Sequence, residues 1–246
     1  MSETKTNLKD GWTTSESYKK LYQSDEEVAE TLDLLELNGA TALLDNGCGN
    51  GELSIQAARI FPELRISGYD ALESAIVEAR RRASQLGNSN LSFERAWADD
   101  LPLPSASVDR ALFRNVLHHI AQPRAVFAEI ARCLKPGGLL LLQTPYNNRE
   151  DEFSEFLSEF HLVMDDSHRR YYYTLDSLKD DLSECGFSVN TSISSAYPFP
   201  GISERMKDFV LEHGFEDRLE LNQASDGSWS VTLYWIRLTA NKIVTG

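Results

Sequence analysis

Residues 43–51 read LLDNGCGNG, and this stretch decides the fold. Two leucines lead into Asp45, glycines at 47, 49 and 51 follow in alternation, and a helical pattern begins at Glu52. That order predicts a buried strand, a tight turn, and a helix whose amino terminus faces the turn. In such a turn, backbone N–H groups approach a ligand closely and the helix end favours a carboxylate or phosphate. The stretch therefore predicts a site for a nucleotide-like cofactor.

An acidic residue follows at the spacing that such a site needs. The next apolar run, LRISGYD, ends in Asp70. An acid at the tip of a second strand can accept hydrogen bonds from ribose hydroxyls. A dinucleotide dehydrogenase shares this plan, but its fingerprint has a third glycine where this chain has Glu52. The GxGxG spacing therefore leaves a nicotinamide-dependent oxidoreductase as the weaker alternative.

Five ordered motifs carry a family resemblance: DNGCGNG, the acid in GYD, ADDLPLPSASVD, NVLHHIAQP and RCLKPGGLLLL. Together they resemble the class I S-adenosylmethionine (SAM)-dependent methyltransferases. Within that class they are most similar to the small-molecule branch of the ubiquinone and menaquinone C-methyltransferases (methyltransferase type 11). The resemblance covers residues 41–145 firmly and 167–187 loosely. It implies SAM as cofactor, S-adenosylhomocysteine as product and a Rossmann-like α/β fold with a seven-stranded sheet.

Composition sets limits that agree with this resemblance. A chain of 246 residues that is 41% hydrophobic predicts a single domain, 1–246, with insertions. A net charge of −14 argues against binding nucleic acid, which needs clustered Lys and Arg. The chain has no 18-residue apolar stretch and a polar amino terminus, so we expect no membrane span and a cytoplasmic location. Three widely spaced cysteines favour reduced thiols, and no Cys or His spacing predicts a metal site.

Strand and helix patterns alternate along the chain, which predicts a mostly parallel sheet with helices on both faces. A leader helix over 15–37 precedes the SAM-binding core at 41–145. Helical patterns follow at 51–60, 72–86 and 123–133, and strands at 41–46, 64–70, 91–97, 111–113, 139–143 and 228–240.

Two less regular segments, about 146–173 and 197–224, are expected as helical cap insertions, because the resembled family covers its substrate pocket with segments at these places. In the first, four large apolar residues share one helical face: Phe153, Phe156, Leu157 and Phe160. This face predicts either a core-packing helix or a partner surface. It is the first candidate for a homodimer interface.

By resemblance, Gly47, Cys48 and Gly49 contact the amino-acid tail of SAM, and Asp45 shapes the turn and helps to hold the ammonium. Asp70, with Ala71 beside it, takes the ribose hydroxyls. The structural alternative for both acids is capping or turn stabilisation.

The adenine end departs from the family pattern, in which an acid accepts from the purine amino group. The aligned residues here are Ala96, Trp97 and Ala98. Trp97 either packs on the purine or is part of the core. Recognition of the amino group then falls to the backbone of Ala98 and to Asp99.

Polar residues after the fourth strand are candidates for chemistry. Open α/β sheets bind ligands at the carboxyl ends of their strands, which places Arg114 and Asn115 near the sulfonium. His118 or His119 is a candidate general base for a hydroxyl substrate, the alternative being a histidine that fixes the loop.

SHRRYYYTLDSL is a second candidate group, because the resembled family often has an aromatic-rich segment with a histidine at this place. The resemblance implies His168 as a further catalytic candidate and Tyr171 to Tyr173 as pocket residues; the alternative is that the three tyrosines are half-buried packing residues. Tyr18 in the leader helix is expected either to close over the SAM tail or to pack in the core.

The function expected from these features is methyl transfer from SAM to a small organic molecule, such as a quinone-like, phenolic or amine compound. The alternative of a different class is a SAM-binding protein that does not methylate: a cyclase, a decarboxylase or an inactive partner subunit. General base catalysis is not required, because orientation of an activated acceptor can lower the barrier by about 7–11 kcal/mol.

Overall fold

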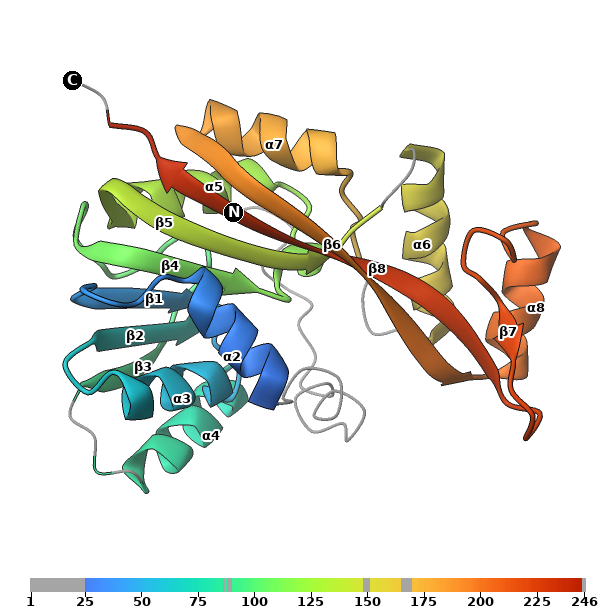
Figure 1. Cartoon of the computed structure of the whole chain (residues 1–246), viewed down its shortest axis with the longest axis horizontal. Helices are drawn as coiled ribbons and strands as arrows, with labels where there is room; N and C mark the ends of the chain where they lie inside the picture. The colour runs from blue at the N-terminus through green and yellow to red at the C-terminus, as the bar shows by residue number, and fades with distance from the viewer. Residues whose placement is uncertain (1–24, 86, 88–89, 148–150, 165–169, 245–246) are drawn as a thin grey trace.

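The computed structural model describes residues 25–85, 87, 90–147, 151–164 and 170–244. In this part of the chain one sheet of eight strands runs in the order β3-β2-β1-β4-β5-β8-β6, and the short β7 pairs with β8 (Figure 1). The strands are β1 (Ala42–Asn46), β2 (Arg65–Asp70), β3 (Leu91–Arg95), β4 (Val108–Arg114), β5 (Leu134–Pro145), β6 (Phe187–Ile202), β7 (Asn222–Gln223) and β8 (Trp229–Lys242).

The described helices connect these strands. They are α2 (Asp25–Leu34), α3 (Glu52–Ile60), α4 (Glu73–Ser84), the 3-10 turn η2 (Leu117–His119), α5 (Pro123–Cys133), α6 (Asp151–Met164), α7 (Leu175–Glu184) and α8 (Glu204–Glu212). None of these helices has the length and apolar character needed to cross a membrane.

Strands β1 to β5 are parallel to one another, and β8 runs antiparallel between β5 and β6. Apolar side chains of α5 and α7 fill the core on one face, and those of α2 and α3 fill the core on the other. The predicted mostly parallel sheet with helices on both faces is therefore confirmed. The two-residue β7 is an addition to the seven strands that were expected.

Some element boundaries differ from the sequence prediction. Of the predicted leader helix at 15–37, the structure describes the part from Asp25 and ends it at Leu34. The fourth strand begins at Val108, three residues before the predicted ALF. Residues 197–202, predicted by resemblance as the start of a cap insertion, continue β6 and pair with β8. Edge strands tolerate proline because one side of the backbone needs no ladder hydrogen bond.

The outer halves of β6 and β8 leave the main sheet as a twisted two-stranded ribbon, and α6, α8 and β7 pack against it (Figure 1). This second lobe has its own hydrophobic core, in which the predicted apolar face of α6 is fully buried. The core-packing interpretation of that face is confirmed. Its four aromatic and leucine side chains are therefore covered within the chain rather than presented to a partner.

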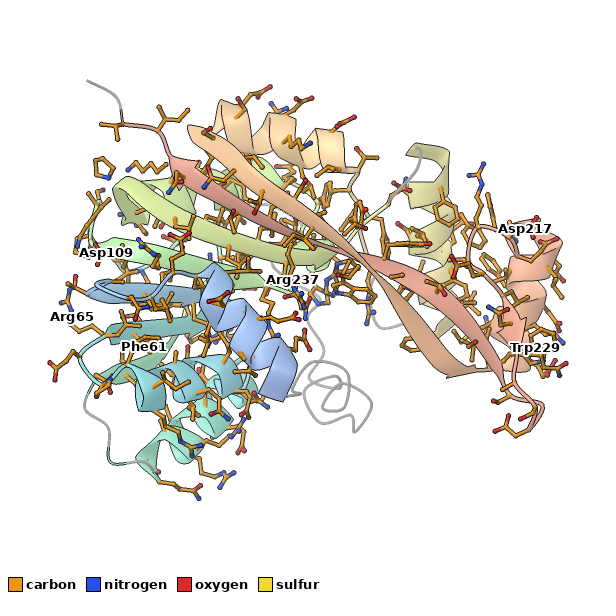
Figure 2. All side chains as sticks on the ribbon, in the orientation of Figure 1. Phe61, Arg65, Asp109, Asp217, Trp229 and Arg237 are labelled. Atoms are coloured by element: carbon orange, nitrogen blue, oxygen red, sulfur yellow. The ribbon has the colours of Figure 1, made fainter. Side chains whose placement is uncertain are left out.

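Asp109 joins three strands at the end of the sheet opposite to the glycine turn (Figure 2). Its Oδ2 accepts hydrogen bonds from the Thr41 and Ala42 backbone N–H groups at 2.9 and 3.0 Å, and its Oδ1 lies 2.6 Å from Lys135 Nζ. Partial burial opposes ionisation, but hydrogen bonds from Lys135 and Thr41 hold the pKa of Asp109 well below its usual range. The ionised carboxylate therefore stabilises the folded state.

We expect Asp109→Asn to lower the free energy of unfolding by about 1–3 kcal/mol at pH 7. A depressed folded pKa adds stability above the unfolded value near 4, and this contribution is lost as the pH falls further. Urea unfolding of both proteins between pH 7 and pH 3 measures the difference, which should shrink below pH 4. A difference that grows in acid would contradict this assignment.

Candidate functional site

The glycine turn is held by the end of β2. The N–H groups of Gly47 and Cys48 both donate to the Tyr69 carbonyl, at 2.7 and 2.9 Å, and the Gly49 N–H donates to Asp70 Oδ2 at 2.9 Å. The expectation that the N–H groups of this turn face a ligand is therefore wrong for these three residues. Since their donors are already used within the protein, they do not form a cradle for a phosphate or carboxylate.

Asp45 instead provides a buried negative group directly before the turn. Its side chain is 3% exposed, and its Oδ2 accepts from Ser54 Oγ at 2.6 Å. Burial raises the pKa of Asp45 to about 6, although the Ser54 hydrogen bond and the nearby Arg114 charge favour ionisation. A buried carboxylate with a raised pKa gains from a cationic ligand, which favours its charged form. The turn and Asp45 are thus suited to an ammonium group.

Asp70 lies at the end of β2, next to the turn. It is 8% exposed, and its two oxygens accept from the N–H groups of Gly49 and Leu72, both at 2.9 Å. Each carboxylate oxygen has two lone pairs, so Asp70 retains acceptor capacity for ligand hydroxyls. The predicted neighbour Ala71 is partly exposed, and its carbonyl accepts from Arg95 Nε at 2.9 Å.

The three residues predicted for the adenine end form one turn beyond β3. Trp97 is partly exposed, and its carbonyl accepts from the Asp100 N–H at 3.0 Å. Its predicted packing on the purine and its alternative role in the core both stay predictions. The Ala98 carbonyl accepts from Asn46 Nδ2 at 3.0 Å, and Asp99 is exposed.

Arg114 at the end of β4 belongs to a charged network with the leader helix. Its Nη1 lies 3.3 Å from Glu27 Oε1, which also accepts from Gln143 Nε2 at 3.2 Å. Arg237 of β8 pairs with Glu30 of the same helix at 2.8 Å and lies where α2 approaches the sheet (Figure 2). Much of the Arg114 charge is therefore directed at Glu27. This network was not predicted, because its members are distant in sequence.

The structure brings His118 next to the aromatic segment that was predicted as a second candidate group. His118 is 9% exposed, and its carbonyl accepts from the Tyr171 N–H at 2.8 Å. The His118 and His119 rings lie 4.0 Å apart between centroids. Tyr172 is buried and Tyr173 donates to the Ile120 carbonyl.

His168 and Tyr18 lie outside the described residues, so their predicted roles stay predictions.

A buried histidine that sequence reasoning missed lies on α6. His161 is 4% exposed, and the Tyr172 hydroxyl lies 2.9 Å from its Nε2. Burial raises the pKa of Tyr172 well above its usual value. The pair ties α6 to the segment that contacts His118. Its only sequence signal is that His161 follows Phe160 at the end of the apolar face.

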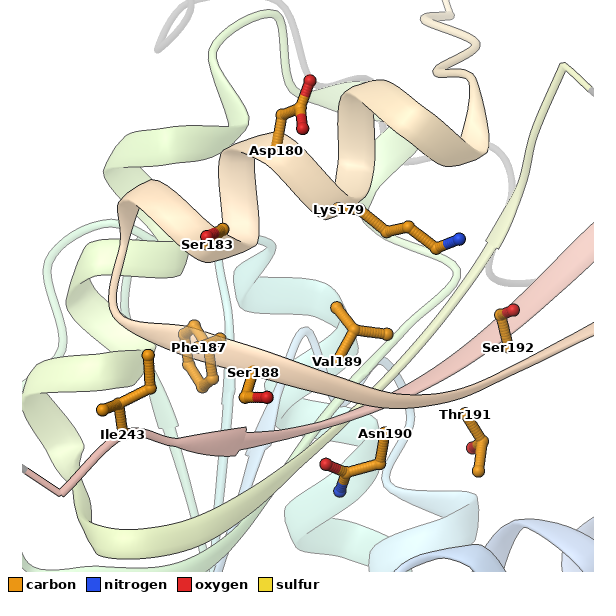
Figure 3. A pocket seen from close by; sticks show the side chains of 10 residues that line it. All are labelled: Lys179, Asp180, Ser183, Phe187, Ser188, Val189, Asn190, Thr191, Ser192 and Ile243. Carbon is orange, nitrogen blue, oxygen red and sulfur yellow. The ribbon is translucent and has the colours of Figure 1, made fainter.

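A separate groove of about 510 Å³ lies between α7 and the first half of β6 (Figure 3). It is lined by Lys179, Asp180 and the polar residues from Ser188 to Ser192. This part of β6 pairs with the last residues of β8, as Ser188 does with Asn241. Asn241 in turn pairs with Leu139, at the beginning of the apolar run of β5. The groove is therefore remote from the glycine turn, which lies at the carboxyl ends of the parallel strands.

The comparison with protein families decides between the interpretations of this site. Residues 37–183, which include the glycine turn, Asp70 and both histidines after β4, match the family model described as a methyltransferase domain. The chain belongs to this methyltransferase domain family. The resemblance found in the sequence motifs is confirmed, and the match gives no support to a nicotinamide-dependent oxidoreductase.

Curated relatives of this methyltransferase domain agree with the match. The chain is 28% identical over 152 residues to the uncharacterized methyltransferase YcgJ of Bacillus subtilis, covering 62% of this chain and 59% of the relative. It is 36% identical over 110 residues to the 27-O-demethylrifamycin SV methyltransferase of Amycolatopsis mediterranei, covering 44% and 40%. The chain thus spans about half the length of these two relatives.

The fold of this methyltransferase domain is also found among solved structures. The crystal structure of YcgJ from Bacillus subtilis has a TM-score of 0.79 at 21% identity, covering 90% of this chain and all of that one. A methyltransferase structure from Bacillus halodurans has a TM-score of 0.78 at 20% identity, covering 89% and 100%. The predicted Rossmann-like fold is confirmed.

Two glycines of the turn provide a matched pair of substitutions. Gly47 and Gly49 both have positive φ, at 82° and 54°. A Cβ at Gly47 would overlap the Val116 side chain, whereas a Cβ at Gly49 would have no heavy atom within 4 Å. We expect Gly47→Ala to lower the free energy of unfolding by about 2–5 kcal/mol, from positive-φ strain plus overpacking.

Gly49→Ala should lower it by only about 1–2 kcal/mol, the cost of the backbone conformation alone. Denaturant unfolding of both variants without ligand gives the comparison. Equal losses would show that Val116 moves aside and does not restrict the turn.

Proposed function

We propose that this protein is a SAM-dependent methyltransferase that methylates a small organic molecule and releases S-adenosylhomocysteine. The observation that carries the proposal is the family match across the whole glycine turn and the acid at the end of β2. The rifamycin relative supports a small-molecule acceptor by its name. A demethylmenaquinone methyltransferase of Listeria monocytogenes, 31% identical over 112 residues, adds the same support.

The residues present fit the parts of SAM. Buried Asp45 suits the ammonium of the amino-acid tail. The turn is closely packed at Gly47, where the Val116 side chain leaves no room for a Cβ. Asp70 provides acceptors for the ribose hydroxyls, and Trp97 with Asp99 provides a ring and a carboxylate for adenine. SAM supplies an electrophilic methyl group. The protein binds and orients SAM and the methyl acceptor, and it excludes water from the site.

The methyl acceptor is proposed to bind between the carboxyl ends of the parallel strands and the second lobe. The backbone of His118 lies at this boundary, because its carbonyl accepts from the Tyr171 N–H, and the predicted cap segments contain α6 and α8. For a hydroxyl acceptor, His118 or His119 would take the proton as general base. For an amine or activated carbon, orientation in this space suffices.

Two further proposals concern the cellular setting. A cytoplasmic location is supported by three free cysteines, at 48, 133 and 185, which suit a reducing compartment. A homodimer remains a proposal, but the aromatic face of α6 is buried and does not support it.

Asp70→Ala should weaken SAM binding more than tenfold, because the variant loses charged hydrogen bonds to the ribose and the acceptor for Gly49 N–H. Isothermal titration calorimetry measures the affinity. Asp109→Asn, which alters a carboxylate at the other end of the sheet, should leave the affinity within about twofold. Unchanged SAM affinity in Asp70→Ala would remove Asp70 from the cofactor site.

Methyl transfer itself is tested with SAM labelled on its methyl group and incubated with pools of small metabolites. A methyltransferase releases S-adenosylhomocysteine in proportion to labelled product. A cyclase, a decarboxylase or an inactive SAM-binding subunit binds the cofactor but forms no labelled product. Asp70→Ala is the control for protein-dependent turnover.

A further inference from the structure

Asn115 has a side-chain N–H₂ group that lacks an acceptor in the described part of the chain. The residue is 4% exposed, and its Nδ2 is buried without a hydrogen-bond partner. Buried donors in folded proteins are nearly always paired, and an unmet donor destabilises the protein. Such a group is explained when a bound molecule supplies the acceptor.

The orientation of this amide is fixed from three directions. Its Oδ1 accepts from the Trp235 indole Nε1 at 3.3 Å, so the amide oxygen and nitrogen cannot be exchanged without losing that bond. Its backbone N–H donates to the Gln143 carbonyl at 2.7 Å. The backbone has a φ of 57°, a left-handed conformation that asparagine tolerates better than most residues. The Nδ2 group therefore points away from the indole.

Asn115 also lies where the two halves of the molecule meet. The next residue, Val116, packs against Gly47 in the glycine turn. Trp235 belongs to the hydrophobic core of the second lobe, and His118 contacts Tyr171. The amide is therefore between the proposed cofactor turn and the lobe that borders the proposed acceptor space.

We propose that Asn115 Nδ2 donates a hydrogen bond to an oxygen atom of a bound small molecule, and that Trp235 sets the direction of this donor. The inference rests on the proposed function. The oxygen comes either from the carboxylate of the cofactor or from a hydroxyl, carbonyl or carboxylate of the methyl acceptor. Because an amide neither takes nor releases a proton here, Asn115 binds and orients the ligand and does not act as a base.

The first measurement compares two ligands by calorimetry: S-adenosylhomocysteine and 5′-methylthioadenosine, which lacks the carboxylate. Asn115→Asp keeps the shape and an acceptor for Trp235 but replaces the N–H₂ donor with an ionisable oxygen, so Asn115→Gly, which removes the donor without adding charge, is measured beside it. If the cofactor carboxylate is the partner, Asn115→Asp binds S-adenosylhomocysteine at least tenfold more weakly than the wild-type protein does. Its affinity for methylthioadenosine stays within twofold of the wild-type value. If Asn115→Asp does not fold, Asn115→Gly, which the positive φ allows without strain, is used alone.

The second measurement follows the ¹⁵N-labelled side-chain amide of Asn115 by NMR, with its signal identified by its loss in Asn115→Asp. Saturation with S-adenosylhomocysteine is followed by titration with catechol and then trans-aconitate, a phenolic and a carboxylate probe. A shift on the first addition assigns the cofactor; a shift only with catechol or trans-aconitate assigns the acceptor. Trp235→Phe keeps an aromatic ring but removes the indole N–H that bonds to Asn115. This variant should show a smaller ligand-induced shift of the Asn115 amide signal.

The proposal is overturned if the amide signal moves with none of the three compounds and Asn115→Asp binds S-adenosylhomocysteine with unchanged affinity. Failure of the proposed function has a different result: wild-type protein would then bind neither S-adenosylhomocysteine nor methylthioadenosine. An unchanged amide shift in Trp235→Phe would remove the role of Trp235 while keeping that of Asn115.

Discussion

Three hydrogen bonds from the glycine turn to the end of β2 determine where the other groups of the site lie. They use the N–H groups of Gly47, Cys48 and Gly49, and they join the turn to Tyr69 and Asp70. Because Asp70 is both an acceptor for the turn and the proposed ribose ligand, turn geometry and sugar binding are coupled through one carboxylate. The buried Asp45 then faces a turn whose donors are already paired, which favours a cationic ligand over an anionic one.

The consecutive motifs predicted much of this arrangement, because strand, turn, helix, strand and acid follow one another along the chain. Asp45, the glycine turn and Asp70 could be placed from local pattern alone. The direction of the turn N–H groups could not, since the same glycine pattern allows donors to face a ligand or the neighbouring strand. The start of the second insertion could not be placed either: residues 197–202 were expected in a cap, whereas they continue β6, whose edge position in the sheet is compatible with their prolines.

Contacts between distant segments were beyond the reach of sequence pattern. Asn115 and Trp235 are 120 residues apart, and Trp235 lies in a strand whose alternating pattern gives no sign of its indole partner. His161 and the Glu27 network were missed for the same reason: each depends on how a helix packs against the sheet. The proposed site thus includes residues of both the glycine-turn core and the second lobe, of which only the first has a strong local signature.

The glycine turn contains a cysteine, Cys48, whose protonation state matters if an electrophilic methyl donor binds beside it. Burial raises the pKa of Cys48 well above its usual value, with the nearby Asp45 and Asp70 charges adding to the effect. A thiolate is a strong nucleophile, whereas the protonated thiol is not. If the turn holds a sulfonium methyl donor, as we propose, Cys48 stands in that turn as a protonated thiol, the less nucleophilic of its two forms.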